Sequence, residues 1–268
     1  MSKKFKDLFN TSKPIIAMVH LPALPGSPLY DSKLGLDHII QVAEKDLIAL
    51  QDAGVDAVMF GNENDRPYEF NVNQASSSTM AYVIGNLKNK IKIPFGVNIL
   101  WDPMSTIAVA ASTGAHFVRE IFTGTYASDM GLWKPDAGKA VRYRKSVDRE
   151  DLLLFFNISA EFAYSLDKRS VAERAKSAII SSKPDAILVS GNVTGESADL
   201  NELKSVKEIV TEVPVLANTG VNISNVEETL KFADGVIIGS SLKVDGDTWN
   251  AVDEKRAIDF MQKVKSLR

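Results

Sequence analysis

The stretches PVLANTGV at 214–221 and ADGVIIGSSLKVDG at 233–246 decide the fold that this chain is expected to adopt. Each is a short apolar run that ends in a turn of small residues, Thr219-Gly220 in the first and Gly239-Ser240-Ser241 in the second. A segment with helical periodicity lies between them. A strand, a turn and a helix that lead to another strand form a βα unit, and repeated units predict a parallel sheet.

The same pattern repeats along the whole chain. Runs rich in Val, Ile, Leu and Phe alternate with segments of helical periodicity, such as 36–53 and 200–211. Eight such units in about 250 residues match a TIM barrel, whereas a doubly wound sheet normally stops at about five or six strands. We therefore predict an α/β fold, a single (β/α)₈ TIM barrel domain over residues 1–268. The predicted strands are 14–20, 55–61, 94–100, 116–122, 152–158, 185–190, 214–219 and 234–239.

The last two predicted strands end where barrels frequently bind phosphate. Gly220 and Gly239 let an anion approach the backbone, whose N–H groups supply partial positive charge near a helix start. Either glycine alone can simply form a turn, but their joint placement favours an anion site. Hydroxyl groups and one lysine follow directly. We predict that a phosphate-bearing small molecule is bound by Asn218, Thr219, Gly220, Gly239, Ser240, Ser241 and Lys243.

The first two predicted strands end in residues that can transfer protons. His20 stands at the tip of the first strand, in MVHLPALPGSP, and it can exchange protons near neutral pH or bind a metal ion. A histidine held by the loop for structural reasons is the alternative. After the second strand, GNENDRPY gathers amides and carboxylates, including Asn62, Glu63 and Asp65, which can ligate Mg²⁺ or Mn²⁺, act as a base or bind sugar hydroxyls. Glu63 lies nearest the strand, so His20 and Glu63 are the predicted catalytic residues.

The middle strands place further polar side chains at the same end of the barrel. Arg119 and Glu120 stand inside an apolar strand, where a charge is costly to bury unless it is paired. Arg119 is therefore predicted either to contact the ligand or to hold the barrel mouth in an ion pair. Amide and hydroxyl groups around the rim orient polyhydroxylated ligands and predict a sugar or nucleoside portion. The rim comprises Asn62, Asn98, Asn157, Ser159, Ser190, Asn192, Thr194 and Asn218.

Composition excludes several classes of protein. The chain carries 31 Lys and Arg against 34 Asp and Glu, so it lacks the basic surface of a nucleic-acid-binding protein. The absence of cysteine removes disulfides and thiolate chemistry. No apolar stretch approaches the roughly 20 residues of a membrane helix, and no signal-peptide pattern is present, so we expect a cytoplasmic protein without a membrane span. No dinucleotide, Walker, HExxH or GxSxG motif occurs, and we expect no required cofactor, with a divalent metal ion kept as an alternative.

Several motifs together resemble the BtpA/SgcQ family of barrel proteins. The opening MVHLPALPGSP and the closing ADGVIIGSSLKVDG are the most specific, and AGVDAVMFGNEND, GVNIL, GAHFVRE, TGTYASDMG, DAILVSGNVTG and PVLANTGV extend the resemblance nearly end to end. It implies a TIM barrel related to phosphate-binding barrels such as phosphoribosylanthranilate isomerase, with the active site at the barrel mouth. It implies no particular reaction.

Three functions are consistent with these observations. The first is an enzyme that isomerises or hydrolyses a phosphorylated sugar or nucleotide-like metabolite, with His20 and Glu63 transferring protons. The second is a binding or assembly factor without turnover. The third is a divalent-metal-dependent hydrolase built on Glu63, Asp65 and Glu120.

We also expect a homo-oligomer, because closed dimers are the commonest soluble assembly. The segment 126–133 brings Met130, Leu132 and Trp133 close together. It is predicted to be a loop that acts as a contact patch or as a lid over the barrel mouth.

Overall fold

The computed structural model of the chain describes residues 3–191 and 199–268 and contains a closed barrel of parallel strands. Successive barrel strands are neighbours, and the last pairs with the first through Ile15–Val236, Ile16–Ile237 and Ala17–Ile238. Every predicted strand contains one observed strand, so the predicted TIM barrel is confirmed. The strands are β1 (Ile15–His20), β2 (Ala57–Gly61), β3 (Phe95–Asn98), β4 (Phe117–Glu120), β7 (Leu153–Asn157), β9 (Ala186–Ser190), β10 (Val215–Asn218) and β11 (Val236–Ile238).

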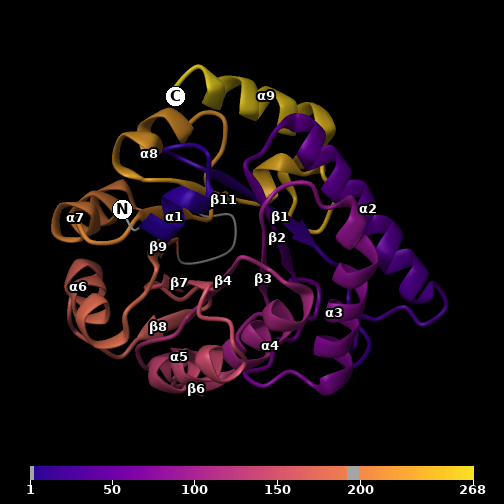
Figure 1. Cartoon of the computed structure of the whole chain (residues 1–268), viewed down its shortest axis with the longest axis horizontal. Coiled ribbons are helices and arrows are strands. Elements are labelled where there is room, and N and C mark those ends of the chain that lie inside the picture. Colours follow the sequence, from indigo (N-terminus) through magenta and orange to yellow (C-terminus); the bar gives the residue numbers. More distant parts are fainter. Residues whose placement is uncertain (1–2, 192–198) are drawn as a thin grey trace.

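Helices form a ring around the outside of the barrel (Figure 1). The two helices predicted from 36–53 and 200–211 are present, with ends within two residues of the prediction. Gly54 ends the first of these with φ +82°, the left-handed conformation in which glycine terminates helices without strain. The outer helices are α2 (Gly35–Ala53), α3 (Gln74–Leu87), α4 (Pro103–Thr113), α5 (Ala137–Ser146), α6 (Val171–Ser182), α7 (Leu200–Ile209), α8 (Val226–Phe232) and α9 (Glu254–Lys265), and short 3₁₀ turns are η1 (Lys88–Lys90), η2 (Ser240–Leu242) and η3 (Val244–Gly246).

Alternation along the strands separates the core into two layers. In β1, Ile15, Ala17 and Val19 pack outward against the helices, whereas Ile16 and Met18 pack inside the barrel. Side chains two residues apart on a strand share a face, so the residue that follows Met18 by two, His20, also faces the interior. The same rule places the predicted strand-end residues in one layer at the top of the barrel interior: His20, Asn98, Arg119, Asn157, Ser190, Asn218 and Gly239.

The opposite end of the barrel is filled by the start of the chain. Helix α1 (Lys3–Leu8) lies inside the ring of outer helices in Figure 1. Its Phe5 lies 5.8 Å from the ring of Phe155, and Phe9 lies 6.0 Å from the ring of Phe117. Both phenylalanines are buried in the interior layer. The start of the chain therefore belongs to the core of the barrel.

The segment 126–133 differs from its prediction as a loop. It forms a hairpin of β5 (Tyr126–Ser128) and β6 (Gly131–Trp133), and β8 (Ala163–Ser165) pairs with β5 to complete a small antiparallel sheet. Because successive side chains on a strand face opposite sides, Trp133 is buried whereas Leu132 is 57% exposed. The short strands escaped prediction because their alternation spans only three residues each. In the described part of the chain, no helix is both long and apolar enough to cross a membrane.

Candidate active site

A pocket of about 440 Å³ opens at the carboxyl ends of the barrel strands. Its volume is in the range of sites that bind small molecules. Most of the predicted site residues line it, and they come from strands far apart in the sequence. These residues are His20, Glu63, Asn98, Arg119, Asn157, Asn218, Thr219, Gly220, Gly239, Ser240 and Ser241.

Arg119 forms the centre of the pocket floor. Its guanidinium donates hydrogen bonds through Nε and Nη2 to Asn98 Oδ1 and through Nη1 to Asn218 Oδ1, 3.0 Å away. Asn98 is held in turn by the side chain of Glu120, and Asn218 by Ser190 Oγ. Because each partner is itself anchored, the buried positive charge has a fixed position. Arg119 is thus paired inside the barrel, and it also lines the pocket, so its contact with a ligand stays a prediction.

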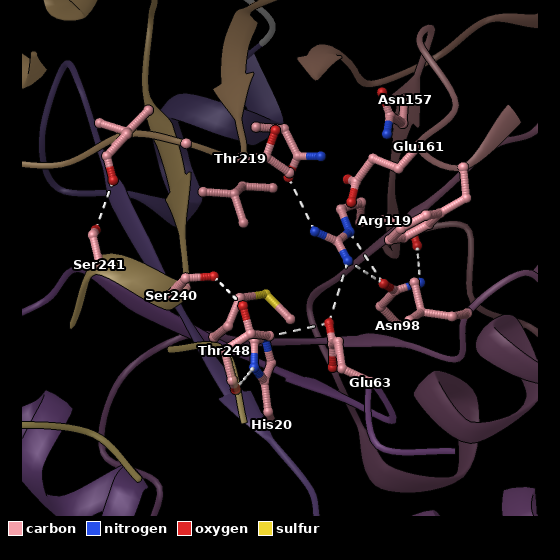
Figure 2. A pocket seen from close by; sticks show the side chains of 18 of the residues that line it. His20, Glu63, Asn98, Arg119, Asn157, Glu161, Thr219, Ser240, Ser241 and Thr248 are labelled. Atoms are coloured by element: carbon pink, nitrogen blue, oxygen red, sulfur yellow. Dashed lines mark hydrogen bonds and ion pairs between the residues drawn. The ribbon is translucent and has the colours of Figure 1, made fainter. Parts of the chain in front are cut away.

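Glu63 lies between Arg119 and His20 (Figure 2). Its Oε1 is 3.4 Å from His20 Nε2 and 3.6 Å from Arg119 Nη2. A Cβ atom on Gly61 would collide with the Glu63 carboxylate, so glycine at the end of β2 is what allows this side chain to fold over the strand tip. The two predicted catalytic residues are thus in direct contact.

The second oxygen of Glu63 is unusual. Oε2 is buried and has no hydrogen-bond partner among the described residues. Burial raises the pKa of Glu63 above its usual value of 4.5, although the charge of Arg119 opposes this shift. A carboxyl group with a raised pKa keeps its proton to a higher pH than an exposed one, and it can serve as a general acid or base.

The protonation state of His20 follows from its surroundings. Burial is the main cause that lowers the pKa of His20 to about 3, and the positive charge of Lys243 is the next. The ring is therefore neutral near pH 7. Its Nδ1 lies 3.3 Å from the carbonyl oxygen of Thr248, which can only accept a hydrogen bond. We therefore assign the proton to Nδ1, which leaves Nε2 unprotonated and able to accept a hydrogen bond from a protonated Glu63. The proton that this pair holds at the pocket wall then resides on Glu63.

The neutral state of His20 can be tested by NMR. We expect the ring ¹⁵N shifts of His20, identified by their loss in His20→Gln, to stay constant between pH 8 and pH 5. The folded-state pKa lies below the unfolded value of 6.5, so the neutral ring contributes stability above pH 6.5 that is lost as the pH falls toward 3. A titration midpoint near 6.5 in the folded protein would contradict the assignment.

The predicted anion end of the pocket is formed by the loops after β10 and β11. Thr219 and Gly220 have positive φ values of 76° and 64°, and this turn exposes the backbone to the cavity. Ser240 Oγ contacts Thr248 Oγ1, and Ser241 Oγ donates to the carbonyl oxygen of Val221. A Cβ on Gly239 would lie 3.2 Å from His20 Cε1, so the absence of a side chain keeps this wall open.

Lys243 does not take the place predicted for it in the anion site. It is buried behind the pocket wall, where its ammonium lies 3.3 Å from Asp46 Oδ2 and donates to the carbonyl oxygen of Asn250. It is not among the residues that line the pocket. Lys243 directly follows η2, and its partner Asp46 belongs to α2. The cation at this end of the pocket is instead Arg256, which belongs to α9.

Three other predicted residues lie beside the pocket without lining it, and two more cannot be placed. Asn62 accepts a hydrogen bond from the backbone N–H of Leu100, and Ser190 supports Asn218. Asp65 accepts from the N–H of Leu24 and from Ser76, so it organises loops. Asn192 and Thr194 lie outside the described residues.

The ligand set of the predicted metal-dependent hydrolase does not converge. Glu63 and Glu120 both line the pocket, but Asp65 is directed into loop contacts, and the two oxygens of Glu120 accept from Asn98 and from the N–H of Ile121. Burial raises the pKa of Glu120 to about 8, which favours its neutral form. Within the described ranges there is no group of three or more His, Asp or Glu residues placed to hold a metal ion.

Several pocket residues were missed by the sequence reasoning. Glu161 and Phe162 follow β7, Trp101 follows β3, and Thr248 stands in the turn before α9. Glu161 lies near Asn157 and Arg119 in Figure 2. The signal available in the sequence was only their position shortly after predicted strands, which many loop residues share.

The fold and the pocket define a TIM barrel with a buried histidine–glutamate pair at its C-terminal mouth. The chain belongs to the BtpA family, whose sequence model matches residues 11–266, and the predicted resemblance is confirmed. The SgcQ protein from the sgc region of Escherichia coli is 46% identical, over 98% of both chains. The photosystem I biogenesis protein BtpA of Synechocystis sp. is 31% identical, over 95% of this chain and 88% of that protein.

Solved structures share the fold at low sequence identity. One is (S)-3-O-geranylgeranylglyceryl phosphate synthase from Thermoplasma acidophilum in complex with sn-glycerol-1-phosphate, with a TM-score of 0.61, 14% identity and 99% coverage of both chains. Another is phosphoribosyl anthranilate isomerase from Thermus thermophilus, with a TM-score of 0.57, 11% identity and coverage of 95% of this chain and 100% of that chain. Such low identities establish the common barrel and nothing finer.

Proposed function

We propose that the protein is an enzyme that isomerises a phosphorylated sugar or nucleotide-like metabolite by proton transfer. The observation that carries this proposal is the carboxyl group of Glu63. It is buried at the pocket wall beside the unprotonated Nε2 of His20, and its Oε2 has no partner within the described residues. A buried polar atom without a partner is costly in a protein that has no use for it, and titratable groups with shifted pKa values gather at functional sites.

The histidine–glutamate pair suits both stages of an isomerisation. Glu63 as a carboxylate removes a proton from one substrate atom, and the pair returns a proton at another atom, so no co-reactant is needed. Arg119, 3.6 Å from Glu63 Oε1, supplies a fixed positive charge beside the atom from which the proton leaves. Hydrolysis of the same class of substrate is the alternative reaction, in which the pair takes the proton from water.

The phosphate group is assigned in this proposal to the end of the pocket near Ser240, Ser241 and Arg256. Arg256 is positively charged, and its planar guanidinium matches the geometry of phosphate oxygens. Its Nη1 lies 3.4 Å from the carbonyl oxygen of Ser241, so it is held next to the serine turn. The names of the two solved neighbours include a phosphorylated substrate, which supports the proposed class of ligand.

Phosphate binding can be tested before a substrate is known. Millimolar inorganic phosphate should raise the melting temperature by mass action on the folded state. We expect Arg256→Gln to remove at least about half of this rise, because it deletes the charge at this end of the pocket. Arg142→Gln is the matched control, since Arg142 lies on the exposed surface of α5, where its Nη1 donates to the carbonyl oxygen of Gly138.

A second variant addresses the same site by steric means. Gly239→Leu would fill the space next to His20 and should abolish the phosphate-induced rise in a protein that still folds. An unchanged rise in a folded Gly239→Leu protein would place the anion elsewhere.

The name of the Synechocystis relative favours a second candidate, an assembly factor that binds without turnover. The two candidates differ in what they require of the pocket. An enzyme needs the proton-transferring groups of Glu63 and His20, whereas an assembly factor keeps its function when Glu63 is replaced by glutamine.

A further inference from the structure

The pocket has one wall of a different chemical character from the rest. The end of the pocket with the serine and arginine residues is polar. This wall, by contrast, is formed by Leu100, Trp101, Ile121 and Phe162, which are apolar or aromatic. We call these four residues the aromatic wall. Trp101 and Ile121 are 4% and 5% exposed, so the wall is largely shielded from water before any ligand binds.

The two aromatic residues of this wall have strained backbones. Trp101 has φ +122° and Phe162 has φ +52°, a region that bulky residues rarely adopt. They stand in different loops, after β3 and after β7. Strain of this kind persists only where the surrounding structure holds it, and it is concentrated at ligand-binding sites. Its occurrence at two residues of one wall indicates that the placement of both rings matters.

Other aromatic rings fix the wall from behind. The ring of Trp101 lies 4.8 Å from that of Trp133 and 6.5 Å from that of Phe162. Trp133 is stacked on Phe70, with the two ring planes only 5° apart. The small sheet of β5, β6 and β8 therefore supports the wall through Trp133, and the wall is rigid.

One polar atom in the wall is left without a partner. The indole Nε1 of Trp101 is buried and makes no hydrogen bond within the described residues. An indole N–H can only donate, and buried donors normally find an acceptor. Trp101 also lines the pocket, so a ligand that presents an acceptor atom from an otherwise apolar, flat surface would satisfy this donor where it reaches the indole edge. A sugar ring alone fits less well, because its several hydroxyl groups would each need a partner in this apolar surrounding.

We propose that the aromatic wall binds a planar heteroaromatic ring of the substrate, with a ring acceptor atom facing the indole N–H of Trp101. The inference rests on the proposed function, since it assigns the phosphate of the same molecule to the serine and arginine end. It narrows the substrate class to a phosphorylated sugar that carries a planar nitrogen-containing ring. A pocket of about 440 Å³ has room for such a molecule.

Two matched probes test the ring subsite, ribose 5-phosphate without a ring and adenosine 5′-monophosphate with one. We expect adenosine 5′-monophosphate to bind about tenfold or more tightly, because stacking on an aromatic side chain contributes about that much affinity. Phe162→Leu should reduce this advantage about three- to tenfold by removing a ring face. Trp101→Phe keeps an aromatic ring, deletes the N–H and should weaken the ring-bearing probe alone. Equilibrium dialysis with labelled probes measures all these affinities.

The outcomes separate the two proposals. Tyr164→Leu is the control, since Tyr164 is 79% exposed, lies two residues from Phe162 and does not line the pocket. Equal binding of both probes to the unaltered protein would overturn the ring subsite and leave the phosphate site standing. Equal weakening of both probes in folded Phe162→Leu and Trp101→Phe proteins would also overturn it. Binding of neither probe would contradict the phosphate site and the ring subsite together.

Discussion

Glu63→Gln should lower kcat by about 10²–10⁴-fold on the metabolite that a thermal-shift screen identifies, the range that a positioned acid–base group contributes. Glutamine has nearly the same shape as glutamate, so the contacts with His20 and Arg119 and the affinity for phosphate should change little. The proton-transferring group alone is lost. Because burial raises the pKa of Glu63, the acid limb of the kcat profile should lie above pH 4.5 and disappear in the variant.

The control for this prediction is Glu69→Gln. Glu69 is an exposed carboxylate in the same loop that does not line the pocket, and its replacement should leave kcat unchanged. If His20→Ala and Glu63→Gln both retained the kcat of the unaltered protein, the assignment of this pair would be wrong. Arg119 and Glu120 would then be the next candidates. Absence of any turnover in the unaltered protein would favour the assembly factor.

Lys243→Met should destabilise the protein by about 3–5 kcal/mol, the usual consequence of leaving a buried charge without its partner. Lys243 is 1% exposed and Asp46 is 2% exposed, so neither charge can turn to water. Asp46 would keep its bond from the backbone N–H of Val252 but lose its counter-ion. Urea denaturation followed by circular dichroism gives the free energy of unfolding.

Lys255→Met provides the comparison for that measurement. Lys255 pairs with Asp259 on the exposed face of α9, and because such pairs contribute little to stability, the free energy of unfolding should change little in this variant. A loss below about 1 kcal/mol in Lys243→Met would mean that the buried pair has little role in stability. If phosphate no longer raised the melting temperature of the folded Lys243→Met protein, the prediction from the sequence that Lys243 binds the anion would regain support.

The sequence allowed the barrel and the ring of strand-end residues to be predicted for one physical reason. Each strand is buried on both faces, so it reads as a continuous apolar run, and the first polar residue after such a run falls at the barrel mouth. His20, Asn98, Arg119, Asn157 and Asn218 were found in this way. Their common direction into the interior follows from the two-residue period of a strand.

Residues beyond the strand ends could not be placed by that reasoning. Lys243 and Arg256 are both cations near the end of the chain, and only the path of η2, η3 and α9 decides which of them reaches the pocket. Trp101 and Phe162 depend on positive φ values that no sequence pattern announces in a bulky residue. Side-chain direction in irregular segments is set by tertiary contacts, which local periodicity does not encode.

The phenylalanines of the N-terminal segment give the barrel a closed floor. Phe5 and Phe9 occupy the end that faces away from the pocket, so molecules exchange with the interior through the mouth alone as far as the described residues extend. In the proposed enzyme, substrate and product would use the same opening and exclude each other from it. Each turnover would then end with departure of the product before the next molecule enters, and accumulated product would compete directly with substrate for the empty site.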